Sequence, residues 1–210
     1  MSKKIINKNK KKKIFLANII TLGNGQVGKT SLIIKYVDNT FSLNYIQTLG
    51  MDFKIKMVKL QNSEEIRVKI TDTAGQERFG SLSSNYLKKA NGIILIYDIT
   101  NRESFEALNN WADEIKEKSK SDEARPIILI GNKLDLEGNR CISKEEGENF
   151  AKNNCGGINF YETSCKTGEN VENAINDLVS QVYNKYSGNY LNEGNNIKIN
   201  GNNEKKKKCC

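Results

Sequence analysis

The chain has 210 residues with a formal net charge of +8, and it contains five cysteines and no histidine. This length predicts a single globular domain with tails, and the absence of histidine excludes Ser-His-Asp catalysis, Cys-His catalysis and histidine-ligated metals. The odd cysteine count argues against a secreted disulfide scaffold. No run reaches the roughly 18 apolar residues that span a bilayer, so we expect membrane contact to be peripheral or through attached lipid.

The positive charge is concentrated at the two ends of the chain. Residues 1–13 carry +7 and residues 187–210 carry +3, which leaves −2 for residues 14–186. An anionic membrane surface is therefore a more natural partner than nucleic acid, which we do not expect this chain to bind. We divide the chain into a basic, mobile N-terminal extension (1–13), a folded domain (14–186) and a flexible tail (187–210) whose composition cannot form a packed core.

Two kinds of strand pattern follow one another along the folded domain. Residues 53–57 and 66–70 alternate apolar and polar side chains on either side of a polar turn, which predicts an antiparallel pair near one edge of a sheet. Residues 93–97 and 127–130 are short and continuously apolar, as in parallel strands buried on both faces.

Helical patterns lie between and after these strands. Phe105 to Ile115 and Val171 to Val182 place apolar residues three and four positions apart. Thr100 with Glu103, and Ser143 with Glu146, have the spacing of capping boxes and predict two helix starts. Together the patterns predict an α/β fold, a doubly wound, mostly parallel six-stranded sheet flanked by helices.

The first motif fits GxxxxGK[ST] and lies between an apolar run and a helical segment, where a phosphate-binding loop belongs. Its backbone N–H groups would surround phosphates, its lysine would meet the β- and γ-phosphate charge, and its threonine hydroxyl would bind Mg²⁺. The motif and the serine that follows it are the predicted nucleotide-binding residues Gly23, Asn24, Gly25, Gln26, Val27, Gly28, Lys29, Thr30 and Ser31.

A second motif, Asp72 to Gln76, follows the strand that ends at Ile70. Asp72 is expected at the carboxyl end of that strand beside the phosphate loop, within reach of a Mg²⁺ shell. Gly75 would then offer its N–H to the γ-phosphate, and Gln76 would orient the attacking water.

The third motif, Asn132-Lys133-Leu134-Asp135, follows the buried strand 127–130 directly. A carboxylate at Asp135 can accept two hydrogen bonds from the ring N–H and the exocyclic amine of guanine, whereas adenine offers no such pair. The order of the three motifs therefore favours a guanine nucleotide over ATP. Competition of bound fluorescent GTP by ATP would distinguish this from a P-loop ATPase or small-molecule kinase.

With these motifs in place, residues 15–186 resemble the Rab branch of the Ras superfamily, since 45–53 match its first switch and 72–79 its second. The resemblance implies that Thr48 gives Mg²⁺ a second hydroxyl, joining Thr30 and Asp72 as metal ligands. It also implies that Phe41 packs against the base and Tyr45 closes over the phosphates. The remaining guanine contacts would come from the loop of Ser164, Cys165 and Lys166, where the family usually has alanine at Cys165; we expect that thiol to be buried and inert.

The terminal sequence of four lysines followed by Cys209 and Cys210 resembles the Rab signal for geranylgeranylation. Two lipid chains beside a basic patch give stable anchoring. The resemblance implies a vesicle-traffic switch on the cytoplasmic face of an intracellular membrane, cycling through the cytosol, with GTP/GDP and Mg²⁺ bound. It also implies as partners an exchange factor, a GTPase-activating protein, the prenylation machinery, a GDP-dissociation inhibitor and Rab effectors.

Two positions depart from the family pattern. Gln26 replaces a usual glycine in the phosphate loop, which predicts altered nucleotide affinity or exchange. Thr71 replaces a tryptophan in the predicted effector-binding set of Phe53, Thr71 and Tyr86, which predicts an unusual set of effectors. These departures leave open an alternative, a GTP-binding membrane scaffold with little turnover, although the retained Gln76 argues for hydrolysis.

Overall fold

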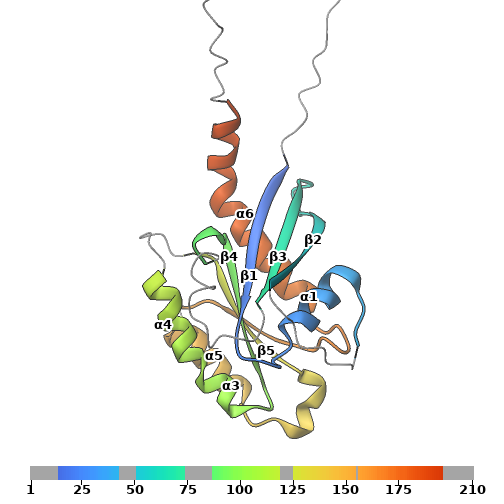
Figure 1. The fold of residues 1–210 in the computed structure, drawn as a ribbon, viewed down its shortest axis with the longest axis vertical. Helices are drawn as coiled ribbons and strands as arrows, with labels where there is room; N and C mark the ends of the chain where they lie inside the picture. The colour runs from blue at the N-terminus through green and yellow to red at the C-terminus, as the bar shows by residue number, and fades with distance from the viewer. Residues whose placement is uncertain (1–13, 43–50, 74–86, 119–124, 155, 196–210) are drawn as a thin grey trace, which may run out of the picture.

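The computed structural model describes residues 14–42, 51–73, 87–118, 125–154 and 156–195. They contain a six-stranded sheet in the order β2-β3-β1-β4-β5-β6 (Figure 1). Only β2 runs antiparallel, against β3 at one edge, so the predicted mostly parallel sheet is confirmed. The strands are β1 (Phe15–Leu22), β2 (Met51–Lys59), β3 (Glu65–Thr73), β4 (Gly92–Asp98), β5 (Ile127–Asn132) and β6 (Asn159–Thr163).

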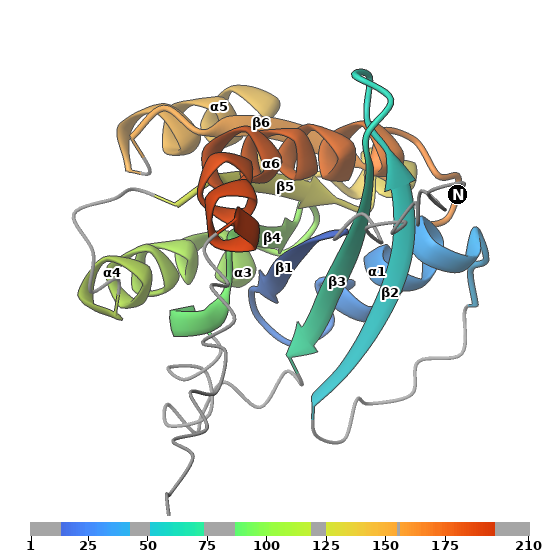
Figure 2. The ribbon, with the colours of Figure 1, turned by 90° about the horizontal axis from the view of Figure 1, so that it is seen from above.

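Helices cover the sheet on both sides and bury two apolar cores (Figure 2). One core lies between the sheet and the helices α1 and α6, and the other between the sheet and α3, α4 and α5. The helices are α1 (Lys29–Asp38), α3 (Arg102–Glu106), α4 (Leu108–Lys118), α5 (Lys144–Asn153) and α6 (Val171–Asn195), with a 3₁₀ helix η1 (Leu134–Asn139).

The two apolar runs that were predicted as doubly buried strands are β4 and β5. Residues 93–97 and 128–130 are fully buried in the centre of the sheet. Both of their faces meet helices, which is why neither run alternates with polar residues.

One predicted helix start is confirmed and the other is wrong. Ser143 caps α5 in a capping box with Glu146. Thr100 does not cap α3, because its backbone N–H and its hydroxyl both donate to Asp98 Oδ1, at 2.9 and 2.8 Å. The cap is instead Asn101, whose side chain accepts from the Ser104 N–H.

The last helix is longer than the sequence pattern predicted. We placed the end of the folded domain at Tyr186, but α6 continues to Asn195. Once its first turns pack against the sheet, each further residue adds a backbone hydrogen bond without a new nucleation cost, so polar residues can extend the helix. None of the described helices is both long and apolar enough to cross a membrane.

The carboxyl ends of the parallel strands form one end of the sheet, which we call the carboxyl edge, and their amino ends form the opposite end, the amino edge. The two ends differ in function. Chain segments that follow the parallel strands leave at the carboxyl edge, where the described residues of the three motifs converge. The start of β1 and the end of α6 both lie toward the opposite, amino edge (Figure 1). There the Phe15 and Tyr183 rings contact edge to face, with centroids 5.5 Å apart.

Candidate nucleotide-binding site

The loop from Gly23 to Gly28 joins β1 to the first turn of α1, and two of its glycines are required by their surroundings. Gly23 has a φ of 142°, and a Cβ there would collide with the Ile96 carbonyl. Gly28 has a φ of 99°, and a Cβ there would collide with the Asn132 side-chain amide. The loop therefore presents backbone N–H groups at the N-terminus of α1, a geometry that binds phosphate.

The side chain of Lys29 is held in place by hydrogen bonds to carbonyl oxygens of this loop. Its side chain is buried, and its Nζ donates to the carbonyl oxygens of Gly23 at 2.5 Å and Asn24 at 2.8 Å. The Asn24 side chain in turn accepts from Trp111 Nε1 at 3.2 Å, which ties the loop to α4. The cation is thus positioned inside the loop, where the motif places the β- and γ-phosphates.

Gln26 lies at the exposed tip of the loop with a φ of 66°. This left-handed conformation is strained for a residue with a side chain and costs of order 1–2 kcal/mol. The strain explains physically why glycine suits this position. Gly25 beside it is exposed, while Val27 is buried in the core under the loop.

Two oxygen ligands predicted for Mg²⁺ lie together at the carboxyl edge. The Thr30 hydroxyl in the first turn of α1 donates to Asp72 Oδ2 at 2.5 Å, and Asp72 is 4% exposed near the end of β3. Hydroxyl and carboxylate oxygens are hard ligands of the kind that Mg²⁺ prefers. The residues therefore fit this ion, and Ser31 follows Thr30 in the same helical turn.

Asn132 connects the three loops around the predicted base pocket. It is 2% exposed at the end of β5, and its Nδ2 donates to the Val27 carbonyl at 2.9 Å. Its Oδ1 accepts from the Thr163 hydroxyl at 3.1 Å and from the Cys165 thiol at 3.3 Å. One amide therefore links the phosphate loop to the loop that follows β6.

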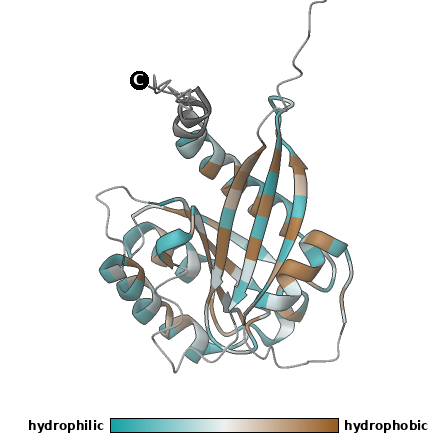
Figure 3. Cartoon of the chain, turned by 45° about the horizontal axis from the view of Figure 1, so that its top comes forward, coloured by the Kyte–Doolittle hydropathy of each residue, from teal (hydrophilic) through white to brown (hydrophobic). Residues whose placement is uncertain are grey.

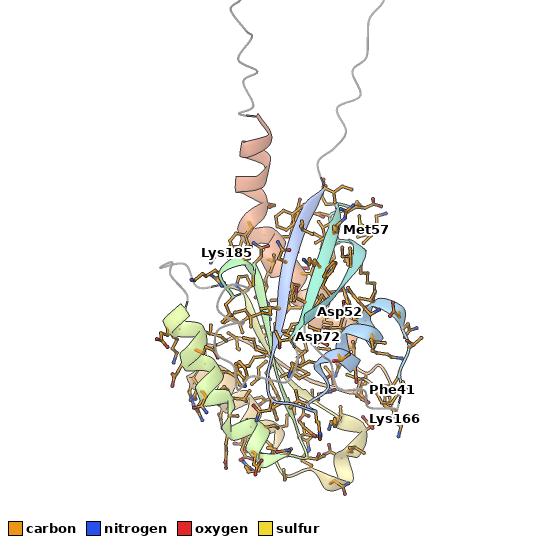
Figure 4. All side chains as sticks on the ribbon, viewed as in Figure 1. Phe41, Asp52, Met57, Asp72, Lys166 and Lys185 are labelled. Carbon is orange, nitrogen blue, oxygen red and sulfur yellow. The ribbon has the colours of Figure 1, made fainter. Side chains whose placement is uncertain are left out.

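Asp135 and Ser164 meet across the same pocket. The buried Ser164 hydroxyl donates to Asp135 Oδ1 at 2.6 Å, while the Asp135 side chain itself is exposed. The hydrogen bond orients the carboxylate and uses one lone pair of Oδ1, so both oxygens can still accept from a donor pair such as that of guanine. Lys166 is exposed on the same loop, and Figure 4 shows it and Phe41 on one side of the molecule. Phe41 is 37% exposed.

The sequence analysis assigned no role to two acidic residues that form ion pairs around the site, Asp98 and Glu162. Lys133, with a φ of 70°, forms an ion pair with Asp98 Oδ2 at 2.6 Å at the end of β4. Arg140 pairs with the buried Glu162 at 2.5 Å. Asp98 could have been found by the signal that identified Asp72, an acid directly after an apolar strand. Glu162 lies on β6 and carries no such local signal, because its partner Arg140 is 22 positions earlier in the chain.

Cys165 is a buried thiol, as we expected. Its side chain is 3% exposed, and burial is the main cause that raises its pKa to about 12. A thiol that stays protonated is neither a nucleophile nor a metal ligand at neutral pH. Its contribution here is the hydrogen bond to Asn132.

Several predicted residues cannot be compared with this geometry. The switch residues Tyr45, Thr48, Gly75 and Gln76, the effector residue Tyr86 and the two cysteines Cys209 and Cys210 lie outside the described residues. Phe53 and Thr71, the other two predicted effector residues, are paired across β2 and β3, and Phe53 is 52% exposed.

Comparison with known proteins agrees with this geometry. The model of the Ras family matches residues 18–184. The chain is 41% identical over 173 residues to the Ras-related protein Rab-13 of Mesocricetus auratus, covering 82% of this chain and 83% of that one. It is 39% identical over 197 residues to human Rab-8B, covering 91% and 93%. It is 41% identical over 172 residues to Rab-1 of Theileria parva, covering 81% and 76%. This chain therefore belongs to the Ras family, among its Rab small GTPases.

Proposed function

We propose that this Rab GTPase is a membrane-traffic switch that binds GTP, recruits effectors while GTP is bound and releases them after hydrolysis. The observation that supports the proposal is the convergence of the described parts of three motifs at one end of the sheet. Asn132 is hydrogen-bonded to the phosphate loop at Val27, and Thr30 of that loop is hydrogen-bonded to Asp72. A scaffold without turnover would need the same binding loops, so hydrolysis must be tested directly.

In the proposed cycle the phosphates of GTP lie in the loop of residues 23–30 and its base lies against Asp135. Thr30, Thr48 and Asp72 would hold Mg²⁺, which neutralises phosphate charge when it is bound. Gln76 would orient the attacking water, and Gly75 would donate its N–H to the γ-phosphate. We expect slow intrinsic hydrolysis that an activating protein accelerates by supplying an arginine to the transition-state charge.

We further propose that the protein is anchored at the cytoplasmic face of an intracellular membrane by geranylgeranyl groups on Cys209 and Cys210. Support comes from topology, because α6, which leads to this segment, ends toward the amino edge of the sheet, opposite the nucleotide loops (Figure 1). The lysine-rich residues 1–13 precede β1 at that same edge. A membrane at that end would leave the nucleotide site open to an exchange factor and an activating protein. A GDP-dissociation inhibitor would extract the lipidated protein from the membrane.

Single-turnover hydrolysis of preloaded GTP with Mg²⁺, compared between the parent and Gln76→Leu, tests the switch. We expect the parent to turn over and the variant to slow strongly. If neither hydrolyses GTP even with a broad-specificity Rab activating protein, the cycling function is refuted and the scaffold alternative stands.

The effector surface has its own test. Thr71 lies beside the exposed Phe53 and lacks the large aromatic ring that anchors a binding partner. We expect Thr71→Trp to bind a panel of Rab effectors that the parent binds weakly. Equal binding of the panel by both proteins would contradict this part of the proposal.

A further inference from the structure

A cavity lies at the amino edge of the sheet, at the end opposite the nucleotide loops. Its volume of about 650 Å³ is within the roughly 300–1,000 Å³ of small-ligand sites. Its walls are the amino ends of β5 and β6 and one face of α6, and Figure 2 views this edge with α6 next to the two strands. We call it the amino-edge cavity, and the polar side chains that line it are Arg125, Asn159, Asp177, Gln181, Asn184 and Lys185.

The face of α6 in this cavity is polar and distinct from the apolar stripe of the same helix. Asp177, Gln181, Asn184 and Lys185 recur at helical spacing, so they lie on one face. The apolar stripe from Val171 to Val182 is buried against the sheet. The packing of the helix therefore does not need these polar side chains, which are available to a ligand.

Asp177 organises the polar floor of the cavity. Its Oδ2 accepts hydrogen bonds from Asn159 Nδ2 at 2.7 Å, from the Tyr161 hydroxyl at 2.9 Å and from Gln181 Nε2 at 2.9 Å. Burial and the neighbouring carboxylate raise the pKa of Tyr161 to about 12, so its hydroxyl remains a donor. These bonds hold the carboxylate in place without using Oδ1 or the second N–H of either amide. The floor can therefore both accept from and donate to the hydroxyl groups of a ligand.

Two cations line the same cavity, against a single acid among its described residues. The half-buried Arg125 is fixed by a hydrogen bond from its Nη1 to the Leu87 carbonyl, which leaves further guanidinium N–H groups for an anion. Lys185 is exposed at the rim. Asp122 and Glu123, which precede Arg125, lie outside the described residues. Arginine with lysine is a combination that suits phosphate.

The lining also decides against other classes of ligand. It contains no aromatic side chain among the described residues, so the base of a nucleotide would have no ring on which to stack. Its apolar residues are Pro126, Ile127 and Ile158 alone, too few to enclose an apolar molecule. A polyol that carries phosphate satisfies both parts of the lining, with its hydroxyls on the polar floor and its phosphate on the cations.

The position of the cavity indicates where such a ligand would come from. Lys185 lies toward the amino edge (Figure 4), and in Figure 3 α6 leaves the sheet at the same end of the molecule as the start of β1. The segments that follow these two elements outward carry +7 over residues 1–13 and +3 over residues 187–210. The membrane proposed above would face this edge, and basic pockets beside a membrane bind phosphorylated headgroups.

We propose that the amino-edge cavity binds a phosphorylated polyol, supplied at the membrane by the headgroup of an inositol phospholipid. The phosphates contact Arg125 and Lys185, and the ring hydroxyls contact Asp177 and the neighbouring amides. The lipid source rests on the proposed membrane anchoring, whereas the binding site itself does not.

The first measurement uses soluble headgroups and the full-length protein loaded with GDP. Inositol trisphosphate is compared with benzene trisphosphate, which carries three phosphates on a ring without hydroxyls. We expect inositol trisphosphate to bind at least about tenfold more tightly, because only its hydroxyls can use the polar floor. Amide NMR signals of Gly157 and Asn159 and the side-chain amide of Asn184 should shift on binding and locate the ligand.

Matched substitutions make the test specific to the cavity. Arg125→Gln with Lys185→Gln should weaken inositol trisphosphate at least about tenfold. Lys185→Gln alone changes an exposed helical position, so the fold is retained, and it should weaken binding at least about threefold. Lys116→Gln with Lys144→Gln removes the same charge from exposed positions of α4 and α5 and should change the affinity by less than about twofold.

The second measurement distinguishes a membrane source from a soluble one. Vesicles of phosphatidylcholine contain either phosphatidylinositol bisphosphate or enough phosphatidylserine to give the same total negative charge. We expect the parent to bind the inositol lipid vesicles at least about threefold more tightly. The variant with Arg125→Gln and Lys185→Gln should lose this preference while its basic ends still attract both kinds of vesicle.

Several results would overturn the inference. They are failure of inositol trisphosphate to bind the folded parent, equal binding of the two ring phosphates, and NMR changes confined to the lysine-rich ends. Tight soluble binding without a vesicle preference would assign the cavity to a soluble phosphorylated polyol instead. Absence of lipid on Cys209 and Cys210, seen by mass spectrometry of protein from eukaryotic cells, would refute the proposed anchoring and leave the soluble binding standing.

Discussion

Replacement of Asn132 by alanine should separate the loops of the nucleotide site. The side chain is 2% exposed and forms hydrogen bonds with the Val27 carbonyl, the Thr163 hydroxyl and the Cys165 thiol. A buried hydrogen bond contributes about 1 kcal/mol net, and a buried group left without its partner costs about 1–3 kcal/mol. We therefore expect Asn132→Ala to lower the free energy of unfolding by about 2–4 kcal/mol. For a chain of this size that is a fall in Tm of roughly 4–16 °C.

The assay is thermal unfolding at several GDP concentrations, so that the contribution of bound nucleotide can be separated from the stability of the fold. The rate at which a fluorescent GDP analogue is released is measured alongside. We expect the variant to release it at least about tenfold faster than the parent, because a loss of 1.4 kcal/mol of binding free energy is a factor of ten. The control is Asn109→Ala at an exposed position of α4, which should change stability by less than about 0.5 kcal/mol. If Asn132→Ala unfolds within about 2 °C of the parent and releases nucleotide at the parent rate, the linking role of this amide is refuted.

Three further predictions follow from strained, buried and paired groups. Gln26→Gly should relieve the backbone strain at φ 66° and change the nucleotide release rate; a rate equal to the parent's would remove that hypothesis. Exposed Cys141 should react with a thiol reagent at pH 8, whereas Cys165, with its pKa raised to about 12 by burial, should react only after unfolding, as peptide mapping by mass spectrometry would show. The hydrogen bond from Arg102 lowers the pKa of Glu146 from 4.5 to about 2. The modest, solvent-screened contribution of this ion pair to the free energy of unfolding should therefore be present above pH 4.5 and be lost as pH falls toward 2. Glu146→Gln should flatten that part of the stability profile, and an unchanged slope would contradict the pairing.

The sequence by itself determined the fold class and the chemistry of the nucleotide site. Buried parallel strands leave continuous apolar runs and the edge hairpin leaves an alternating one, because side-chain direction along a strand repeats every two residues. The phosphate loop and the Asn132–Asp135 motif are contiguous, so their roles could be inferred from spacing. The placement of Thr48 and Gln76 remains a prediction.

Tertiary structure alone decided how these parts support one another. Asn132 reaches Val27 across 105 positions in the chain, and Arg140, at the end of η1, reaches Glu162 on β6. Local sequence patterns do not indicate such contacts, because the contacts depend on which strands are neighbours in the sheet. The cap of α3 was instead decided locally, because Asp98, two residues before Thr100, accepts from both donors of Thr100. The exposure of Phe53, Ile55 and Met57 also needed the structure, because the same alternating pattern would suit a strand with either face covered, and only the assembled layers leave this face exposed.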